Sequence, residues 1–266
     1  MFDSLLSELD ARHLTRRLTE LSTGVAPVVK IDGQEVLLLA SNDYLGLAGH
    51  SDIIDAAAEA TRRYGVGSGA SRLVSGTLPP HRDMERALAR FKKTASALAF
   101  GSGYLANLGT IPALIGRGGL ILADRLCHAS LIDACRLSGA DFRVYHHNDL
   151  AHLATLLSRR KAARRTLVVT DGVFSMDGDV APLPELFDLT RRYDAELYVD
   201  DAHGTGVMGE TGRGTLEHFH LEDAVPFHMG TLSKAVGCIG GFIVGTEPLI
   251  SYLVNTSPSF MYTTAP

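Results

Sequence analysis

Apolar residues recur with two different periods along the chain. Phe2 and six leucines up to Leu21 stand at roughly helical spacing, which predicts an amphipathic helical arm. Residues 28–40 predict a hairpin that turns at Asp32-Gly33. Helices are predicted at 51–64 and 80–93, with a glycine- and serine-rich loop between them. We therefore expect an N-terminal arm and hairpin over 1–45 and one large domain over 46–266.

The large domain alternates short apolar runs with segments of helical periodicity. The seven runs lie at 96–100, 120–123, 142–145, 166–170, 196–200, 226–229 and 241–245. Strands that alternate with helices imply crossover connections, so the fold class is α/β with a mainly parallel seven-stranded sheet. Ligands of such sheets bind at the carboxyl ends of the strands.

Composition and charge argue against several classes of protein. With a net charge of −5, no overall basic field favours nucleic acid or an acidic membrane. The basic run 159–165 is interpreted as a solvated helix end, against the alternative of a phosphate-backbone patch. Three cysteines at irregular spacing favour neither a metal knuckle nor a disulfide framework. With no signal segment and no apolar run of membrane length, a cytoplasmic protein is predicted.

Two glycine-rich segments are candidates for phosphate binding. Gly101–Asn107 follows the first core strand and leads into a helix, where free N–H groups attract an anion, although such a turn is as often purely structural. Gly65–Ala70 superficially resembles a dinucleotide fingerprint. It follows a helix rather than a strand, so the context that this motif needs is missing.

An acidic cluster with a histidine, Asp200-Asp201-Ala202-His203, ends the strand at 196–200. These side chains are too few to favour a metal site. Asp200 could instead hold a protonated heterocyclic nitrogen, since a carboxylate at that place keeps a pyridinium charged. The plain alternative is a pair of solvated acids beside a loop histidine.

The position of one lysine distinguishes these alternatives. The chain has five lysines: Lys30, Lys92, Lys93, Lys161 and Lys234. Lys30 adjoins the hairpin turn, and the next three are predicted on exposed helix ends. Lys234 alone follows a core strand, among small residues, where desolvation makes an amine nucleophilic. Asp200 and Lys234 are therefore expected to face one crevice.

Five segments together resemble the α-oxoamine synthases, which are pyridoxal-phosphate (PLP) enzymes of the aspartate-aminotransferase fold, PLP fold type I. The segments are Ser41–Leu47, Asp124–Leu131, Asp171–Asp179, Val199–Gly206 and Gly230–Lys234, in the order that the family has them. The resemblance covers nearly the whole chain. It implies a PLP cofactor and the condensation of an amino acid with an acyl thioester, with loss of carbon dioxide.

The resemblance also implies roles for single residues. Lys234 would form the Schiff base with PLP and later remove the Cα proton, and Asp200 would pair with the ring nitrogen. His128 would stack on the ring and Ala202 would pack on its other face. His203 and Ser175 would contact the phenolic oxygen of the ring. The phosphate would be held by Gly103, Tyr104 and Thr231, and the carboxylate of the substrate by Asn42. Each of these side chains also has a plain structural interpretation as a cap, a turn or a local hydrogen bond.

Within the family, segments 147–149, 199–206 and 209–214 are most similar to the members that condense L-alanine with a pimeloyl thioester, carried by coenzyme A or acyl carrier protein. Members that use other amino acids, or a non-catalytic remnant, remain alternatives. Arg16 or Arg17 is the candidate for the far carboxylate of the pimeloyl chain. The family implies a homodimer in which Thr263 and Thr264 reach the partner's phosphate. Its small C-terminal domain, which carries a carboxylate-binding arginine, is expected to be absent from this chain.

Overall fold

The computed structural model describes residues 1–160 and 164–264, and it divides into two compact units. The first unit is Met1–Ser41, and the second begins at Asn42. The first contains α1 (Phe2–Ala11) and the antiparallel strands β1 (Val28–Ile31) and β2 (Gln34–Leu37). The predicted hairpin is confirmed, with Asp32 at φ 49° and Gly33 at φ 79° in its two-residue turn. Turns of this kind need the left-handed conformation at both central positions.

Helix α1 is shorter than the leucine spacing predicted. It ends at Ala11, and His13 adopts a left-handed φ of 55°. The His13 N–H then donates to the Asp10 carbonyl and the Leu14 N–H donates to the Leu9 carbonyl, which closes the helix. The prediction of helix through Leu21 is therefore wrong. Arg16 and Arg17 lie in irregular chain beyond the helix.

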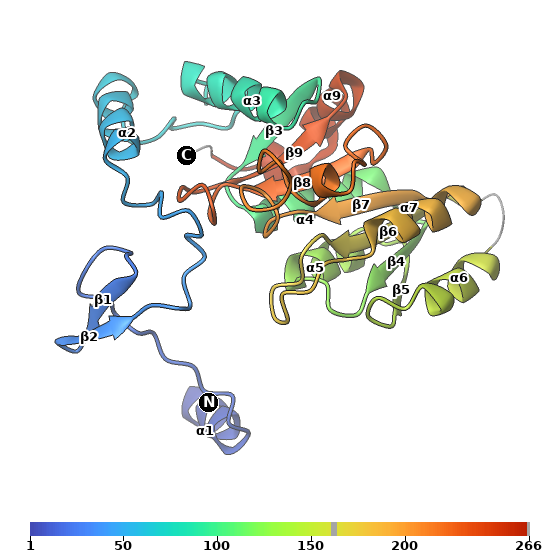
Figure 1. The fold of residues 1–266 in the computed structure, drawn as a ribbon, viewed down its shortest axis with the longest axis horizontal. Coiled ribbons are helices and arrows are strands. Elements are labelled where there is room, and N and C mark those ends of the chain that lie inside the picture. The colour runs from blue at the N-terminus through green and yellow to red at the C-terminus, as the bar shows by residue number, and fades with distance from the viewer. Residues whose placement is uncertain (161–163, 265–266) are drawn as a thin grey trace. The chain divides into compact units, whose positions relative to one another are not determined.

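The second unit is built on a seven-stranded sheet of order β3-β9-β8-β7-β6-β4-β5 (Figure 1). Its strands are β3 (Ser96–Phe100), β4 (Leu120–Asp124), β5 (Asp141–Tyr145), β6 (Thr166–Asp171), β7 (Glu196–Asp200), β8 (Phe227–Thr231) and β9 (Gly241–Gly245). All pairings are parallel except the two that β9 makes. The predicted mainly parallel seven-stranded sheet is confirmed.

The helices of this unit are α2 (Ser51–Tyr64), α3 (Pro79–Phe91), α4 (Gly103–Leu114), α5 (Ala129–Leu137), α6 (Leu150–Ser158), α7 (Leu183–Arg192), α8 (Thr215–His218), α9 (Glu247–Thr256) and α10 (Pro258–Met261). Helices α4 and α5 pack on one face of the sheet, and α6 and α7 pack on the other. None of the helices in the described part of the chain is long and apolar enough to cross a membrane.

The strands are apolar in nearly every position because each face has its own core. In β4, Ile121 and Ala123 pack in a cluster with α4 and α5, while Leu120 and Leu122 pack in a second cluster with α6 and α7. All five residues of β4 are buried. Parallel strands covered on both faces have this continuous apolar pattern. The polar side chains that follow the strands are thereby collected at one edge of the sheet.

The basic run after α6 lies partly outside the described residues, since Lys161 is in the gap at 161–163. Arg159 ends α6 and is exposed, as expected for a solvated helix end. Arg164 differs. It is half-buried and donates to the carbonyls of Gly118 and Gly119 and to Asp141, which ties three segments together. That arginine has a structural role.

Candidate active site

A cavity of about 240 Å³ lies at the carboxyl ends of the parallel strands. It is lined by Ser102, Gly103, Tyr104, His128, Ser130, Asp171, Asp200, Ala202, His203, Met229, Thr231, Ser233 and Lys234. Eight of the residues singled out from the sequence are in this set: Lys234, His128, Asp200, His203, Ala202, Gly103, Tyr104 and Thr231. The roles of these residues stay predictions.

Strand register brings the principal groups together. Asp171 ends β6 and pairs in register with Asp200, which ends β7. Asp200 in turn pairs with Met229 on β8, and Lys234 follows that strand. Because neighbouring parallel strands end at one edge, Asp200 and Lys234 share the cavity, as their predicted strands indicated.

Asp200 is a buried carboxylate with two donors. Its Oδ1 accepts from the Ala202 N–H at 3.0 Å, and its Oδ2 accepts from the Asn107 amide at 2.7 Å. Burial raises the pKa of Asp200, while these hydrogen bonds and the charge of Lys234 oppose the rise. A cation at the open side of this carboxylate would favour its ionised form.

Asp171 was not singled out from the sequence as a site residue. It lines the cavity, is buried, and accepts a hydrogen bond from the His128 N–H at 2.8 Å. Burial, followed by the neighbouring Asp200, raises its pKa well above the usual value. The signal in the sequence was its place at the end of an apolar run one strand before Asp200.

Lys234 is half-buried beside these two carboxyl groups. Desolvation lowers the pKa of its amine, and the charges of Asp200 and Asp171 oppose that shift. A lowered pKa increases the fraction of free amine at neutral pH. Lys234 therefore has the environment that a nucleophilic amine needs.

His203 is held by a residue from an early motif. The Tyr44 hydroxyl lies 2.6 Å from His203 Nδ1 and 3.2 Å from Asn42 Oδ1. Desolvation, then the charges of Lys234 and His128, lower the pKa of His203 to about 4. The ring is therefore neutral at pH 7. Because Asn42 Oδ1 can only accept, the Tyr44 hydroxyl donates to it, and the Tyr44 oxygen accepts from the His203 Nδ1–H.

This shift gives a pH dependence of folding. Because the folded pKa of about 4 lies below the ordinary 6.5, stability supplied by neutral His203 is present above pH 6.5 and falls as the pH drops toward 4. We expect the free energy of unfolding to fall more steeply across this range in the unsubstituted protein than in His203→Gln. Denaturant titrations of both forms at several pH values would measure it. Parallel curves would contradict the assignment.

The end of the cavity near β3 has the features of an anion site. Ser102 caps α4 by accepting from the Leu105 N–H, and Gly103 opens the helix. A Cβ at Gly103 would stand 2.9 Å from Met229 Cε and 3.5 Å from Thr231 Oγ1, so a larger residue here would have to displace the end of the Met229 side chain. The helix is twelve residues long, and its first N–H groups attract negative charge. A phosphate group fits here.

Six predicted site residues are not among the described residues that line the cavity. Asn42 is exposed and is linked to it through Tyr44 and His203, and Ser175 is exposed in the loop after β6. Thr264 forms an isolated bridge with Ser71, and Thr263 lines a different cavity. Arg16 and Arg17 belong to the N-terminal unit. Their predicted contacts with substrate or with a partner subunit stay predictions.

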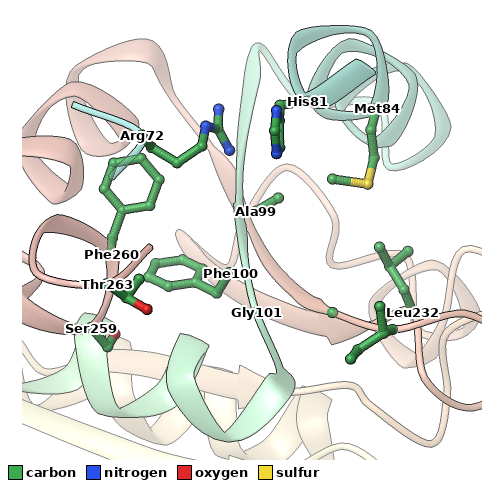
Figure 2. Close-up of a pocket in the computed structure, with 12 residues that line it drawn as sticks. Arg72, His81, Met84, Ala99, Phe100, Gly101, Leu232, Ser259, Phe260 and Thr263 are labelled. Atoms are coloured by element: carbon green, nitrogen blue, oxygen red, sulfur yellow. The ribbon is translucent and has the colours of Figure 1, made fainter. Parts of the chain in front are cut away.

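The cavity that Thr263 lines lies between β3, α3 and α10 and has a volume of about 50 Å³ (Figure 2). Its polar side includes Arg72, whose guanidinium is 3.0 Å from Glu85 and stacks on the Phe260 ring at 5.5 Å. Phe100, Leu232 and Phe260 supply apolar walls. The charge of Arg72 is already neutralised by Glu85, so this cavity offers no reactive group comparable to Lys234.

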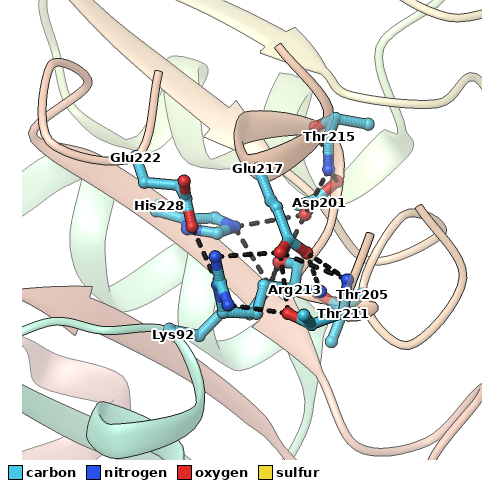
Figure 3. A network of polar contacts seen from close by, with 9 residues as sticks. All are labelled: Lys92, Asp201, Thr205, Thr211, Arg213, Thr215, Glu217, Glu222 and His228. Carbon is cyan, nitrogen blue, oxygen red and sulfur yellow. Dashed lines mark hydrogen bonds and ion pairs between the residues drawn. The ribbon is translucent and has the colours of Figure 1, made fainter. Parts of the chain in front are cut away.

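One prediction about the lysines is wrong. Lys92 follows α3, as expected, but it is buried, with 2% of its surface exposed. Figure 3 shows its ammonium group among Asp201, His228 and Thr205. Asp201 is buried too, so the alternative of two solvated acids at 200–201 is excluded. Apolar spacing did not reveal Lys92, because its partners lie more than a hundred residues later.

The chain belongs to the aminotransferase class I and II family, whose model matches residues 34–266. The expected aspartate-aminotransferase-like fold is thereby confirmed.

Several individual proteins are similar to this chain in sequence or in structure. The chain is 51% identical, over 98% of its length, to 8-amino-7-oxononanoate synthase of Geobacter sulfurreducens, of which it covers 66%. A lysine-to-alanine variant of a serine palmitoyltransferase from S. paucimobilis, with a bound PLP–myriocin aldimine, superposes with a TM-score of 0.93 at 33% identity, covering 99% of this chain and 67% of that one. An 8-amino-7-oxononanoate synthase from Francisella tularensis superposes at 0.72 with 30% identity, covering 85% and 63%. The chain thus spans about two thirds of the length of its curated relatives.

Proposed function

We propose that this chain binds PLP and forms the lysine-bearing part of an 8-amino-7-oxononanoate synthase of biotin biosynthesis. The reaction is the decarboxylating condensation of L-alanine with a pimeloyl thioester. The observation that carries the proposal is the single cavity in which Lys234, Asp200 and His128 meet beside the N-terminus of α4. A PLP molecule needs an amine, a carboxylate and a phosphate site, and this cavity has all three.

Bound PLP supplies an aldehyde that an amine attacks and a pyridinium ring that accepts an electron pair from the amino acid's Cα. Lys234 would hold the cofactor through its amine and, once that amine is free, would take the Cα proton of the amino acid. Asp200 keeps a proton on the ring nitrogen, because its buried carboxylate is more stable beside a cation. His203 would contact the ring oxygen, and His128 would cover the ring.

Other residues are proposed to contact the phosphate, the ring, the substrates and the partner subunit. Thr231, Gly103 and Tyr104 hold the phosphate, Ala202 packs on the ring, and Ser175 and Asn42 approach from exposed loops. The acyl group is carried by coenzyme A or acyl carrier protein. Arg16 or Arg17 binds the far carboxylate, because a guanidinium suits a carboxylate. Two copies form a homodimer in which Thr263 and Thr264 reach the partner's phosphate. Location in the cytoplasm stays a prediction.

The preferred substrates distinguish an 8-amino-7-oxononanoate synthase from a serine palmitoyltransferase. The protein, with whatever further sequence its gene encodes, is supplied with PLP and with either L-alanine and pimeloyl-CoA or L-serine and palmitoyl-CoA. Release of free thiol and carbon dioxide is followed. We expect kcat/KM to be at least about a hundredfold higher with the first pair, since a site built around one substrate discriminates by several kcal/mol.

The second pair tests the rival that the solved serine palmitoyltransferases suggest, and a preference for it would overturn the substrate assignment. Binding of PLP without turnover of either pair is a third possible result. If PLP binds but neither pair reacts, the substrate assignment fails, and a family member that uses another amino acid or a non-catalytic cofactor-binding protein is left.

A further inference from the structure

One buried amide lies directly behind the cavity and contacts two of its walls. Asn107, on α4, has none of its surface exposed. Its Nδ2 is 2.7 Å from Asp200 Oδ2 and 2.8 Å from Ser130 Oγ. Its Oδ1 accepts from the Tyr198 hydroxyl at 2.7 Å. Every polar atom of this side chain therefore has a partner.

These partners fix which way the amide points. An ionised carboxylate can only accept hydrogen bonds, so the NH₂ group of Asn107 must face Asp200. A flipped amide would set Oδ1 against the Asp200 oxygen and NH₂ against the Tyr198 hydroxyl. The orientation follows from the network, and both amide protons are used in it.

The second amide proton determines the hydrogen bonds of His128. Because Asn107 donates to Ser130 Oγ, the Ser130 hydroxyl is free to donate to His128 Nδ1, 2.7 Å away. The Ser130 N–H also points at Nδ1, at 3.2 Å. A ring nitrogen that accepts from two donors carries no proton, so neutral His128 has its proton on Nε2.

We propose that Asn107 is a positioning residue for this site, whose single amide fixes the ionised carboxylate of Asp200 and, through Ser130, the tautomer of His128. The proposal rests on the proposed function, because it assigns Asn107 to the cofactor's ring nitrogen and ring face. Asn107 itself does not line the cavity. Its effect passes through Asp200, which loses one of two donors when the amide is removed.

The test compares PLP affinity, by equilibrium dialysis, in the unsubstituted protein, in Asn107→Leu and in Tyr198→Phe. Leucine keeps the volume and removes the donor, so we expect binding to weaken by about ten- to a hundredfold, the usual effect of losing a hydrogen bond to a charged group. Tyr198→Phe is the matched control. It also removes a hydrogen bond of the same buried amide, but it leaves the contact with Asp200 intact.

We expect Tyr198→Phe to bind PLP within about threefold of the unsubstituted protein, because the Asn107 donor still reaches the carboxylate. Equal losses in both variants would show a merely structural role and overturn the proposal. Unchanged affinity in Asn107→Leu would do the same while leaving the proposed function intact. If the unsubstituted protein does not bind PLP at all, the proposed function fails and this proposal fails with it.

Asn107→Asp covers the case in which the leucine variant does not fold. A carboxyl group beside Asp200 donates when protonated and repels when ionised. The affinity of this variant relative to the unsubstituted protein should therefore fall as the pH rises, and a ratio independent of pH would contradict the proposal.

The tautomer of His128 can be measured directly. In a ¹⁵N NMR spectrum of protein labelled at histidine, with the His128 signals assigned by substituting that residue, the ring proton should be found on Nε2. A proton on Nδ1 would refute the proposal that Asn107, through Ser130, fixes the tautomer of His128.

Discussion

Lys234→Ala is expected to abolish turnover and covalent attachment of PLP while leaving the protein folded. The substitution removes both the nucleophile and the base, and general acid–base catalysis alone contributes about 10²- to 10⁴-fold. We therefore expect kcat to fall by at least about a thousandfold and the visible absorbance of the lysine-bound cofactor to disappear. Steady-state kinetics and absorbance spectra at equal PLP occupancy would measure both.

Lys93→Ala is the control for that experiment. Lys93 is exposed, and it does not line the cavity of Lys234. Its loss should leave the spectrum and kcat unchanged. Because Lys92 is buried elsewhere in the unit, it cannot replace Lys234 without unfolding its surroundings. Appreciable turnover in Lys234→Ala would contradict the assigned role.

Lys92→Met should have the largest effect on stability. The Lys92 ammonium lies 3.5 Å from Asp201, and the two side chains are 1% and 0% exposed (Figure 3). Methionine keeps most of the volume but leaves the Asp201 charge without its cation. Breaking a buried pair in this way costs about 3–5 kcal/mol. We expect the lower end, since Thr215 and His228 still contact Asp201. Denaturant unfolding would measure the loss.

The neighbouring lysine is again the matched control. Lys93→Met makes the same chemical change one residue later, on the surface, and should alter the free energy of unfolding by no more than about 0.5 kcal/mol. The double variant Lys92→Met/Asp201→Asn should recover part of the loss, because the unpaired charge is gone. A loss below about 1 kcal/mol in Lys92→Met would mean that Lys92 is neutral in the folded protein.

The network also bears on acid stability. Lys92, followed by His228, lowers the pKa of Asp201 against the opposing effect of burial. A depressed carboxyl pKa supplies stability above its ordinary value of 3.8, and this stability is lost as the pH falls through the lower folded value. Asp201 therefore supports the folded state at neutral pH. The loop that it holds includes Ala202 and His203, which line the PLP cavity.

Sequence patterns predicted the sheet well because most of its strands are buried on both faces and most of the parallel strands are joined through helices. Runs such as 96–100 and 196–200 coincide with β3 and β7. The placement of Asp200 and Lys234 in one cavity followed from strand ends alone. In contrast, the leucines beyond Ala11 kept a helical period where His13 closes the helix. Local backbone geometry overrode periodicity there.

The buried polar groups were the least predictable part of the site. Asn107, Lys92 and Asp171 have partners that are distant in the chain. A buried asparagine on a helix has no signature of its own, because its value depends on which carboxylate the fold brings to it. Such contacts become visible only when the register of the strands and the position of α4 are known.

Lys234 is proposed to be the residue that carries the cofactor. The measurement is borohydride reduction of the PLP-loaded protein, followed by proteolysis and mapping of the labelled peptide. The reduced bond is stable, so the label reports the lysine that was attached. We predict one labelled peptide, containing Gly230–Gly237 with the label on Lys234. A label on Lys30, Lys92, Lys93 or Lys161 instead would contradict the site assignment and the function built on it.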